Sequence, residues 1–290
     1  MYKKREKAMK TYLEKANTLI EALPYIRKFN SKIIVIKYGG SAMENEALKI
    51  SVMQDIALLK LVGLKPVIVH GGGKEITSMC GKLGVKSEFK NGLRISSKEA
   101  VEVAEMVLFK INKTLVQNLE CQGVKALGIC GKDGGLLHCE KQDESLGFVG
   151  HIKSVRQSVL KDLLEKDFLP IIAPIGMNEN YESFNINADD VACEVSKALR
   201  AEKLVFLSDV EGLYKNYEDK NSLISRIGIK EAKELIKHTQ GGMLVKLNSC
   251  VDALENGVKR VHILDGRVKH SLLLEIFTND GLGTLIGGDL

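Results

Sequence analysis

Residues 33–40 read Ile-Ile-Val-Ile-Lys-Tyr-Gly-Gly, an apolar run that ends in a lysine and a pair of glycines. The β-branched residues predict a buried strand, and open α/β sheets bind their ligands at the carboxyl ends of strands. Glycine lets backbone N–H groups approach anionic oxygens closely, and the ammonium group of Lys37 supplies a mobile positive charge. The stretch therefore indicates a phosphate-handling loop, although a simple turn beside a surface lysine has the same pattern.

A second glycine cluster follows the next apolar segment, Pro66 to Val69, and reads His-Gly-Gly-Gly over residues 70–73. Between the two clusters, apolar residues recur at three- and four-residue intervals over 47–61, which predicts a helix. A strand–helix–strand crossover joins parallel strands with one hand, so both glycine clusters should lie at the same edge of the sheet. Two anion-accepting loops side by side suit a reaction that joins two negatively charged substrates.

The alternation of strands and helices continues to the end of the chain. Further strands are expected at residues 126–129, 169–174, 203–207, 261–264 and 284–286, and further helices at residues 9–23, 74–83, 97–120, 189–199, 229–238 and 244–256. This order predicts an α/β fold, a three-layer αβα sandwich with a mostly parallel central sheet. The first helix should end before Pro24 and pack either on its own domain or on another subunit. We expect three segments, 1–30, 31–198 and 199–290.

The composition is that of a globular protein, with 44% hydrophobic residues in 290. The formal net charge of +5 is spread along the chain and aromatic residues make up only 5%, which argues against a dedicated nucleic-acid-binding surface. No segment approaches the roughly 20 apolar residues that span a bilayer. The basic residues 3–5 are not followed by the apolar region of a signal peptide. We therefore expect a cytoplasmic protein without membrane contact.

Cysteine and histidine usage gives no sign of a metal site. The six cysteines include no Cys-x-x-Cys pair, and the six histidines include no His-x-x-x-His pair. Both patterns are typical of zinc or redox sites, so neither kind of site is indicated. We expect reduced cysteines in the core and no metal cage built from protein side chains.

Two charged residues far from Lys37 have the character of site residues. Lys246 follows the Gly-Gly pair at 241–242 and is expected in the first turn of a helix. A cation there is unfavourable beside the helix dipole unless an anion such as phosphate meets it. Asp189 is expected at the start of another helix, where it would either cap the helix or hold two lysines together.

Polar residues elsewhere suit the binding of a small anionic substrate. Asn185 and Asn187 are separated by one residue, so in an extended segment both amide side chains would point to one side and could bind a carboxylate or an amide. The planar guanidinium group of Arg94 matches a carboxylate, although a surface arginine is the plain alternative. His70 could be proposed as a base, but a backbone-bonded core histidine explains it better.

With these residues in place, the sequence resembles the amino acid kinase family from residue 32 to residue 286. It is most similar to the arginine-sensitive branch that phosphorylates N-acetyl-L-glutamate in bacterial arginine biosynthesis. The motifs occur in the family's order and spacing, as IKYGG (36–40), VHGGG (69–73), NGLR (91–94), NINAD (185–189), LSDVEGL (207–213) and GGMLVK (241–246). Aspartokinase-like chains carry KFGGTS instead, and uridylate-kinase-like chains carry KLSG. The implied fold is that of the carbamate-kinase-like proteins.

The resemblance implies a role for each candidate residue. Lys37 and Lys246 would stabilise charge on the γ-phosphoryl group of ATP as it moves, and Asp189 would hold both lysines. The amino-acid substrate would be bound by Gly72, Gly73, Arg94 and Asn185. The nucleotide would be bound by Gly39, Gly40, Ser208, Asp209, Gly212 and Tyr214. Mg²⁺ would arrive with ATP, held chiefly by its phosphate oxygens.

The implied reaction moves this phosphoryl group to the γ-carboxylate of N-acetyl-L-glutamate and forms N-acetyl-L-glutamyl 5-phosphate. A carboxylate is already ionised at neutral pH, so the reaction needs no general base. The sequence accordingly offers no convincing candidate for one.

The resemblance also implies regulation and assembly. Relatives that arginine inhibits share a helix ahead of the first strand, which interlaces dimers into a hexamer, and a similar carboxyl-terminal pattern. The implied arginine site includes His262, Glu275 and Gly283, although Glu275 would equally fit as a solvated surface residue. Segment 1–30 would serve oligomerisation, 31–198 substrate binding and dimerisation, and 199–290 nucleotide and arginine binding. Lys74 departs from the proline of many relatives, and residues 1–7 extend beyond their usual start.

Three other readings stay open on the sequence alone. A dinucleotide-binding oxidoreductase would need Gly-x-Gly-x-x-Gly after the first strand, and Gly39-Gly40-Ser41-Ala42 lacks the third glycine. A non-catalytic arginine sensor could keep the fold, but the intact Lys37, Asp189 and Lys246 count against it. A kinase of another acidic amino acid is the third alternative.

Overall fold

The structure is a computed structural model that describes residues 2–43, 45–90, 92–216, 218–278 and 281–287. Its centre is an eight-stranded sheet with the order β14-β16-β15-β11-β1-β2-β8-β5. These strands are β1 (Ile33–Tyr38), β2 (Lys65–His70), β5 (Ala126–Cys130), β8 (Leu169–Ala173), β11 (Lys203–Ser208), β14 (Arg226–Ile227), β15 (Val261–Asp265) and β16 (Thr284–Ile286). All pairings are parallel except β15 with β16, so the predicted mostly parallel sheet is confirmed.

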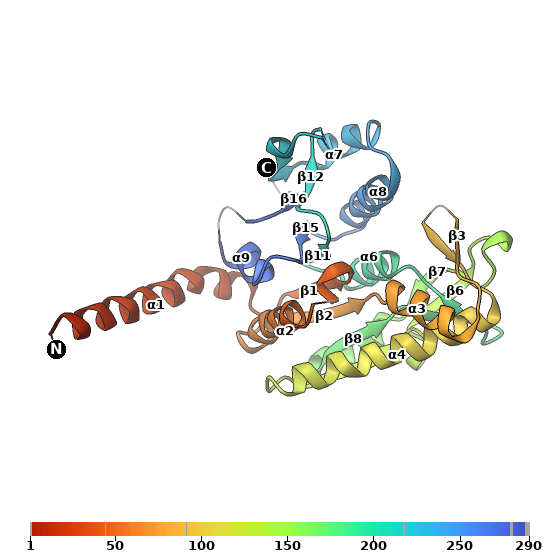
Figure 1. The fold of residues 1–290 in the computed structure, drawn as a ribbon, viewed down its shortest axis with the longest axis horizontal. Coiled ribbons are helices and arrows are strands. Elements are labelled where there is room, and N and C mark those ends of the chain that lie inside the picture. Colours follow the sequence, from red (N-terminus) through yellow and green to blue (C-terminus); the bar gives the residue numbers. More distant parts are fainter. Residues whose placement is uncertain (1, 44, 91, 217, 279–280, 288–290) are drawn as a thin grey trace.

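Helices cover both faces of this sheet and complete the predicted three-layer sandwich (Figure 1). Side chains alternate along β1, with Ile34 and Ile36 packing in one core and Val35 in the other. The first core is closed by α2 (Glu46–Leu61), α4 (Lys98–Glu120) and α9 (Ser271–Phe277). The second core is closed by α5 (Gln157–Glu165), α6 (Ala188–Leu199), α7 (Ile229–Ile236) and α8 (Gly241–Glu255). Both faces of β1 are therefore buried, which explains its continuous apolar run.

Strand register brings the predicted site segments to one edge of the sheet. Lys37 on β1 lies opposite Val69 on β2 and Phe206 on β11. The carboxyl ends of these three parallel strands are adjacent, so the two glycine clusters and the segment after β11 begin side by side. Strands from the predicted segments 31–198 and 199–290 share this one sheet, and the division into functional lobes stays a prediction.

Smaller elements surround the predicted site. A four-stranded sheet has the order β10-β9-β6-β7. Its strands are β6 (Leu137–Lys141), β7 (Gly150–Val155), β9 (Ile175–Met177) and β10 (Ser183–Asn185). Two hairpins, β3–β4 and β12–β13, comprise Glu88–Lys90 with Leu93–Ile95 and Leu213–Tyr214 with Leu223–Ile224. Helix α3 (Gly73–Leu83) starts in the second glycine cluster, and short 3₁₀ turns lie at Gly40–Met43, Asp133–Gly135, Glu144–Leu146 and Lys220–Ser222.

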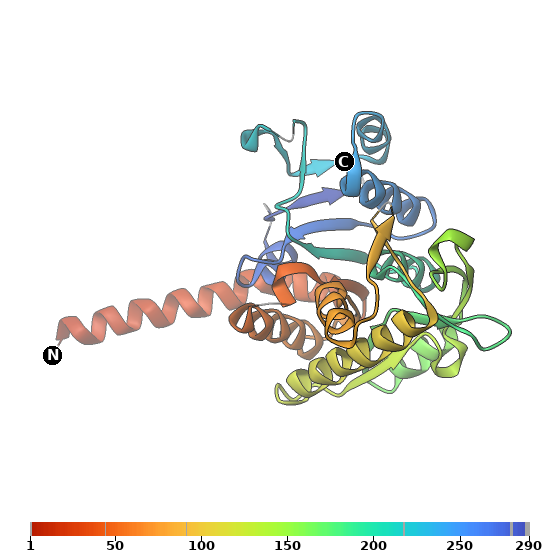
Figure 2. The same cartoon turned by 45° about the vertical axis from the view of Figure 1, so that its right-hand side comes forward.

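Helix α1 (Tyr2–Phe29) projects away from the rest of the molecule in both views (Figures 1 and 2). The prediction that it ends before Pro24 is wrong, because the helix runs through this proline to Phe29. A proline leaves the carbonyl four residues earlier without its donor. That carbonyl belongs to Ile20, which is exposed, so water can serve as the donor. The side chains of Tyr12, Leu13, Leu19, Ile20 and Leu23 are also exposed.

Two further expectations need correction. Helix α8 begins at Gly241 rather than near residue 244, so Lys246 lies beyond the first turn and the helix dipole no longer explains its position. Cys121 follows the end of α4 and is exposed, so the prediction of core cysteines is wrong for this residue, while the other five are buried. Within the described residues, no helix combines the length and apolar character that crossing a membrane requires.

Candidate active site

Three charged side chains from distant parts of the chain meet at the carboxyl edge of the sheet. Lys37 is the penultimate residue of β1, Asp189 lies in the first turn of α6, and Lys246 lies on α8. The Nζ atom of Lys37 is 2.9 Å from Asp189 Oδ1, and the Nζ atom of Lys246 is 2.5 Å from Asp189 Oδ2. One carboxylate therefore holds two ammonium groups, and the cluster keeps a net positive charge of one.

The electrostatics of this cluster favour ionised Asp189. Burial opposes ionisation, but the charges of Lys37 and Lys246 and their hydrogen bonds outweigh it and lower the pKa of Asp189 to about 2. Lys246 also lies over the ring of Phe206, with its Nζ 4.6 Å from the ring centroid. This contact stabilises a cation at a site with little solvent.

The local sequence explains how α6 and α8 present these residues. Asn187, not Asp189, caps α6, because its side chain accepts a hydrogen bond of 2.7 Å from the amide of Asp189. The Oδ1 atom of Asn187 is thereby engaged in the helix cap, and the interpretation of Asn185 and Asn187 as a pair of substrate-binding amides stays a prediction. Lys197 on α6 forms an ion pair with Asp252 on α8 at 2.7 Å. This second ion pair also joins the two helices.

A cavity of about 170 Å³ lies next to the cluster, beside the second glycine cluster. Its lining includes Gly72, Gly73, Arg94 and Asn185, the residues predicted to bind the amino-acid substrate. Asn187 and Ala188 line it as well, immediately before Asp189. The lining thus reaches to one residue before the carboxylate that holds both lysines, and neither lysine is itself a lining residue.

The apolar part of this cavity was missed by sequence reasoning. It is formed by Ile76, Leu108, Val149 and Ile186. Ile76 and Leu108 follow the helical periodicity of α3 and α4, which marks them only as core residues. No pattern in the sequence distinguishes a core residue that also lines a cavity.

Arg94 reaches this cavity from β4 and is already held by several neighbours. Its guanidinium group donates to Ser87 Oγ, to the Gly73 carbonyl at 2.8 Å and to Thr77 Oγ1 at 2.8 Å. It also stacks 4.7 Å from the ring of Phe89. The alternative of a free surface arginine is therefore wrong, since Arg94 is buried and fixed in direction.

The residues predicted to bind the nucleotide form two groups in the structure. Gly40 has a φ of +68°, and a Cβ there would lie 2.3 Å from Asp209 Oδ1, so only glycine fits beside this carboxylate. A Cβ at Gly39 would lie 2.8 Å from Lys37 Nζ. These residues, with Ser208 at the end of β11, belong to the same edge as the lysines.

Gly212 and Tyr214 lie further along the segment that follows β11. A Cβ at Gly212 would lie 2.4 Å from Thr284 Oγ1, and the Tyr214 hydroxyl donates to Glu211 at 2.6 Å. Thr284 Oγ1 also accepts from the amide of Leu213 at 2.8 Å. This part of the segment is therefore fixed against β16.

The three residues predicted for an effector site lie together in the carboxyl-terminal part of the chain. His262 Nδ1 is 2.6 Å from Glu275 Oε1, and both side chains are buried. The other oxygen of Glu275 accepts from the amides of Leu282 at 2.8 Å and Gly283 at 3.3 Å. Burial lowers the pKa of His262 to about 4 against the opposing effect of Glu275. The alternative of a solvated Glu275 is wrong.

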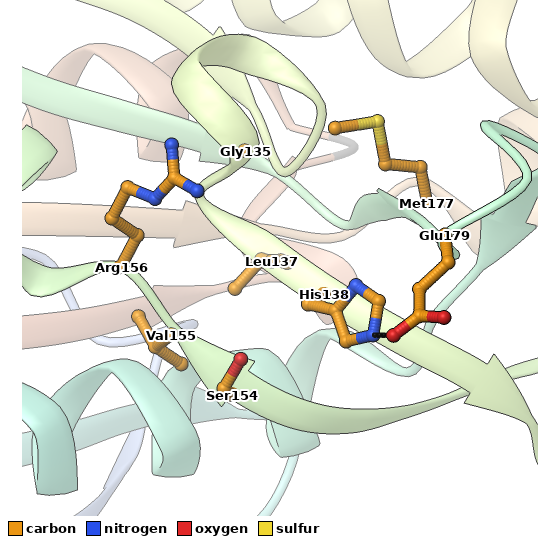
Figure 3. A pocket seen from close by; sticks show the side chains of 8 residues that line it. All are labelled: Gly135, Leu137, His138, Ser154, Val155, Arg156, Met177 and Glu179. Atoms are coloured by element: carbon orange, nitrogen blue, oxygen red, sulfur yellow. Dashed lines mark ion pairs between the residues drawn. The ribbon is translucent and has the colours of Figure 1, made fainter.

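A second cavity, of about 540 Å³, lies on the four-stranded sheet and contains none of the predicted site residues (Figure 3). Arg156, His138 and Glu179 surround it, and His138 points toward Glu179 with 4.0 Å between Nε2 and Oε1. Arg156 donates to the Gly134 carbonyl at 2.9 Å. This cavity shares no lining residue with the substrate cavity or with the cluster of Lys37, Asp189 and Lys246.

Comparison with known proteins places the chain in a family. The model of the amino acid kinase family matches residues 32–265. An acetylglutamate kinase of Campylobacter jejuni (strain RM1221) is 71% identical over 279 residues, which cover 96% of this chain and 100% of that protein. An acetylglutamate kinase of Caldanaerobacter subterraneus subsp. tengcongensis is 52% identical and covers 94% of this chain and 93% of its own length.

Solved structures agree with this placement. The N-acetylglutamate synthase of Neisseria gonorrhoeae, complexed with coenzyme A and N-acetyl-glutamate, matches with a TM-score of 0.84 and 26% identity over 95% of this chain. The chain spans 64% of the length of that synthase chain. Carbamate kinase of Giardia lamblia bound to AMP-PNP matches with a TM-score of 0.69 at 18% identity, over 89% of this chain and 99% of its own, which shows a shared fold. The chain therefore belongs to the amino acid kinase family, and within it to the acetylglutamate kinases.

Proposed function

We propose that this protein transfers the γ-phosphoryl group of ATP to the γ-carboxylate of N-acetyl-L-glutamate, as its relatives named acetylglutamate kinase do. The observation that carries the proposal is the convergence of Lys37 and Lys246 on Asp189 beside a small cavity. Two ammonium groups in one place suit a migrating group that carries several negative charges. This reaction would serve arginine biosynthesis.

The chemistry requires alignment and charge stabilisation rather than proton transfer. An oxygen of the γ-carboxylate bonds to the γ-phosphorus while the bond to the bridging β–γ oxygen breaks, which leaves ADP and an acyl phosphate. Lys37 and Lys246 would stabilise the charge on the oxygens of the moving group, and Asp189 would keep both ammonium groups within reach. Good alignment of bound reactants can supply roughly 7 to 11 kcal/mol of barrier reduction.

The cavity provides the groups that orient the acceptor. Arg94 would bind the α-carboxylate, and Asn185 the acetamido region, while the amides of Gly72 and Gly73 would face substrate oxygens. The apolar walls formed by Leu108, Val149 and Ile186 would receive the uncharged parts of the acylated substrate. A free ammonium group would find no counter-charge on these apolar walls, which favours the acetylated amino acid.

ATP would bind at the carboxyl ends of β1 and β11, where Gly39, Gly40, Ser208 and Asp209 lie, with Gly212 and Tyr214 further along the segment. Mg²⁺ prefers oxygen ligands, and the carboxylate of Asp209 beside Gly40 is of that type. The ion would come with ATP and offset the charge of its phosphates. Among the described residues, no group of three or more His, Cys, Asp or Glu side chains is arranged to hold a metal ion.

A coupled assay of ADP formation tests the proposal and its alternatives together. Glutamate, aspartate, N-acetylglutamate and N-acetylaspartate are compared as acceptors, with hydroxylamine trapping of the acyl phosphate as the product check. We expect kcat/KM to be highest with N-acetylglutamate. A preference for another acidic amino acid would replace the proposed substrate, and no ADP formation with any acceptor would indicate a non-catalytic relative.

Replacing Arg94 with alanine should raise the apparent KM for N-acetylglutamate about 10- to 100-fold and change kcat less, because a charge-assisted pair to the substrate is lost. Steady-state kinetics at saturating ATP measure both constants. Arg156→Ala removes a guanidinium from the cavity shown in Figure 3 and should leave KM unchanged. An unaltered KM in Arg94→Ala would remove Arg94 from the substrate site.

We also propose that α1 joins copies of this chain into a larger homo-oligomer, with a hexamer built as a trimer of dimers as the expected form. Its exposed apolar side chains recur at three- and four-residue spacing, which gives a stripe along one side of the helix. The helix projects from the body, so a second copy can reach this stripe (Figure 2). Stripes of this kind mark contact surfaces between proteins.

Charged substitutions in this stripe should break the assembly. We expect the Leu19→Glu, Ile20→Glu double variant to sediment as a smaller species, because two carboxylates would lose solvent in the interface. A Lys15→Glu, Thr18→Glu pair, which adds two carboxylates outside the stripe, serves as the control. Sedimentation velocity of the three proteins gives the result, and an unchanged size of the first variant would contradict the proposal.

Arginine is the proposed effector at His262, Glu275 and Gly283, in line with the family resemblance. Glu275 is an ionised carboxylate in a buried setting, the kind of partner that a guanidinium group binds in pairs of hydrogen bonds. The amides of Leu282 and Gly283 now occupy one of its oxygens, so arginine would displace them. Repeating the ADP assay with added arginine shows whether the chain responds.

A further inference from the structure

The glycine cluster after β2 is held by a hydrogen-bond relay that starts on α4. Asn112 Nδ2 lies 3.2 Å from His70 Nε2, and His70 Nδ1 lies 2.9 Å from the carbonyl oxygen of Gly71. Both side chains are buried, with exposed fractions of 2% for Asn112 and 0% for His70. Figure 1 places α4 alongside α3 and β8, next to the end of β2. The relay thus connects a helix in the outer layer with the loop at the substrate cavity.

The hydrogen-bond partners fix the protonation of the His70 ring. A carbonyl oxygen only accepts, so Nδ1 carries the hydrogen and donates it to Gly71. Asn112 Nδ2 has two hydrogens and three neighbours, the Ile171 carbonyl at 2.9 Å, His70 Nε2 at 3.2 Å and the Ile129 carbonyl at 3.4 Å. One hydrogen goes to Ile171, and Nε2 is the nearer acceptor for the other. The reverse orientation of the amide would set its oxygen against the Ile171 carbonyl. The ring is therefore neutral, and burial lowers the pKa of His70 to about 4 in agreement.

The sequence around Asn112 is built to admit this side chain. A Cβ at Gly128 on β5 would lie 1.9 Å from Asn112 Oδ1 and 3.0 Å from its Cγ, so any other residue at 128 would displace the amide. Glycine in a strand interior weakens the strand and often marks a close approach. Gly128 therefore leaves space for the Asn112 side chain. Apolar packing alone would not require a glycine at this position.

The pinned carbonyl determines where the next amide points. In a trans peptide, the C=O of Gly71 and the N–H of Gly72 lie in one plane and point in opposite directions. Holding the Gly71 oxygen on His70 thus fixes the direction of the Gly72 N–H, and Gly72 lines the substrate cavity. Gly71 and Gly72 have no side chains that could fix the direction of this amide, because both are glycines with wide backbone freedom.

We propose that His70 and Asn112 are positioning residues, which hold the Gly71–Gly72 peptide in the orientation that lets the Gly72 amide bind the transferring phosphoryl group or the acceptor carboxylate. This inference rests on the proposed kinase function. It replaces the hypothesis of His70 as a base, because a neutral ring with both nitrogens engaged neither takes nor delivers a proton. His70 acts through Gly71 and does not touch the substrate.

Two substitutions at His70 separate positioning from general packing. The amide nitrogen of an asparagine side chain falls near the place of Nδ1, so His70→Asn keeps a donor for the Gly71 carbonyl. The amide of glutamine reaches the place of Nε2, so His70→Gln keeps a partner for Asn112 but loses the bond to Gly71. Both variants lose the ring, so their stabilities should be similar. Asn112→Asp replaces the donating amide with a carboxylate that only accepts, and Asn118→Asp on the same helix is its control.

We expect kcat of His70→Gln to fall about 10- to 100-fold below that of His70→Asn, since a displacement of about 1 Å at a reacting centre costs on that order. KM for ATP and the melting temperature should differ little between the two. Asn112→Asp should lower kcat similarly, and Asn118→Asp should not. Equal kcat values for His70→Gln and His70→Asn would overturn the proposal.

Nuclear magnetic resonance of the wild-type protein with ¹⁵N-labelled histidine gives a readout that needs no turnover. We expect His70 to show the Nδ1–H tautomer without titration between about pH 5.5 and 8.5. A His70 signal that titrates near its ordinary pKa, or the opposite tautomer, would overturn the relay. If the wild-type protein forms no ADP with any acceptor, the proposed function fails on that result alone, and this measurement still decides the relay.

Discussion

Lys246→Met should lower kcat about 100- to 1,000-fold with little change in the KM for N-acetylglutamate, the size of effect seen when one stabilising donor is removed from a developing charge. Methionine keeps the length of the side chain and most of its apolar stem, and the contact of the ammonium group with the ring of Phe206 is lost together with the charge. Only the ammonium group is lost. A selective loss in kcat is therefore a loss of transition-state stabilisation rather than of packing.

The position of Lys246 explains why its effect should fall on kcat. Its Nζ lies on Asp189, outside the set of residues that line the substrate cavity. An interaction that strengthens only when the phosphoryl group moves changes the rate and leaves ground-state binding alone. Lys237→Met removes an exposed lysine of the neighbouring segment and should retain full activity. Normal turnover by Lys246→Met would exclude the charge-stabilising role.

The strand ends at the site could be predicted from the sequence because local rules determine them. The apolar run before Lys37 and the glycines after it indicate a buried strand and an anion loop, and the structure has β1 at that place. The crossover rule then placed the cluster after β2 at the same edge. Local rules did not predict that Lys37 and Lys246 meet, because the two residues are far apart in the chain. Only the family resemblance assigned them to one site.

Errors arose where one local signal was taken as decisive. Pro24 reads as a helix stop, but the structure has a helix on both sides of it. Asp189 reads as a helix cap, but Asn187 takes that place and leaves the carboxylate for the two lysines. Helix α8 begins at Gly241, a residue that usually ends helices. Each of these signals is the preference of a single residue, and the observed structure does not follow it.

The relay through His70 shows what no local pattern encodes. Asn112 has the spacing of a core position on α4, and Gly128 reads as an ordinary strand residue. Their relation appears only when α4 is packed on β5 and β8. A polar residue at a buried helix position is still a signal, because burying an amide is unfavourable unless it is hydrogen-bonded. The sequence shows that such a residue exists, and the fold shows its partner.

Asp189→Asn should reduce both turnover and stability, because the isosteric amide cannot neutralise two ammonium groups. We expect kcat to fall about 100-fold as Lys37 and Lys246 repel each other and lose their common anchor. The free energy of unfolding should fall by about 2 kcal/mol at neutral pH, which corresponds to lowering one carboxyl pKa from 3.8 to about 2. Steady-state kinetics and urea titrations measure the two effects.

The dependence of this stability on pH distinguishes the ion pairs from other effects of the substitution. The pKa of Asp189 is depressed in the folded state, so its contribution is complete above the unfolded pKa and is lost as pH falls through the folded pKa. The difference between wild type and Asp189→Asn should thus be constant from about pH 7 to 5 and shrink between about pH 4 and 2. Asp162→Asn, at an exposed position on α5, should show no such trend. A difference that persists undiminished at the acid end would mean that packing, rather than the two lysines, accounts for the stabilisation by Asp189.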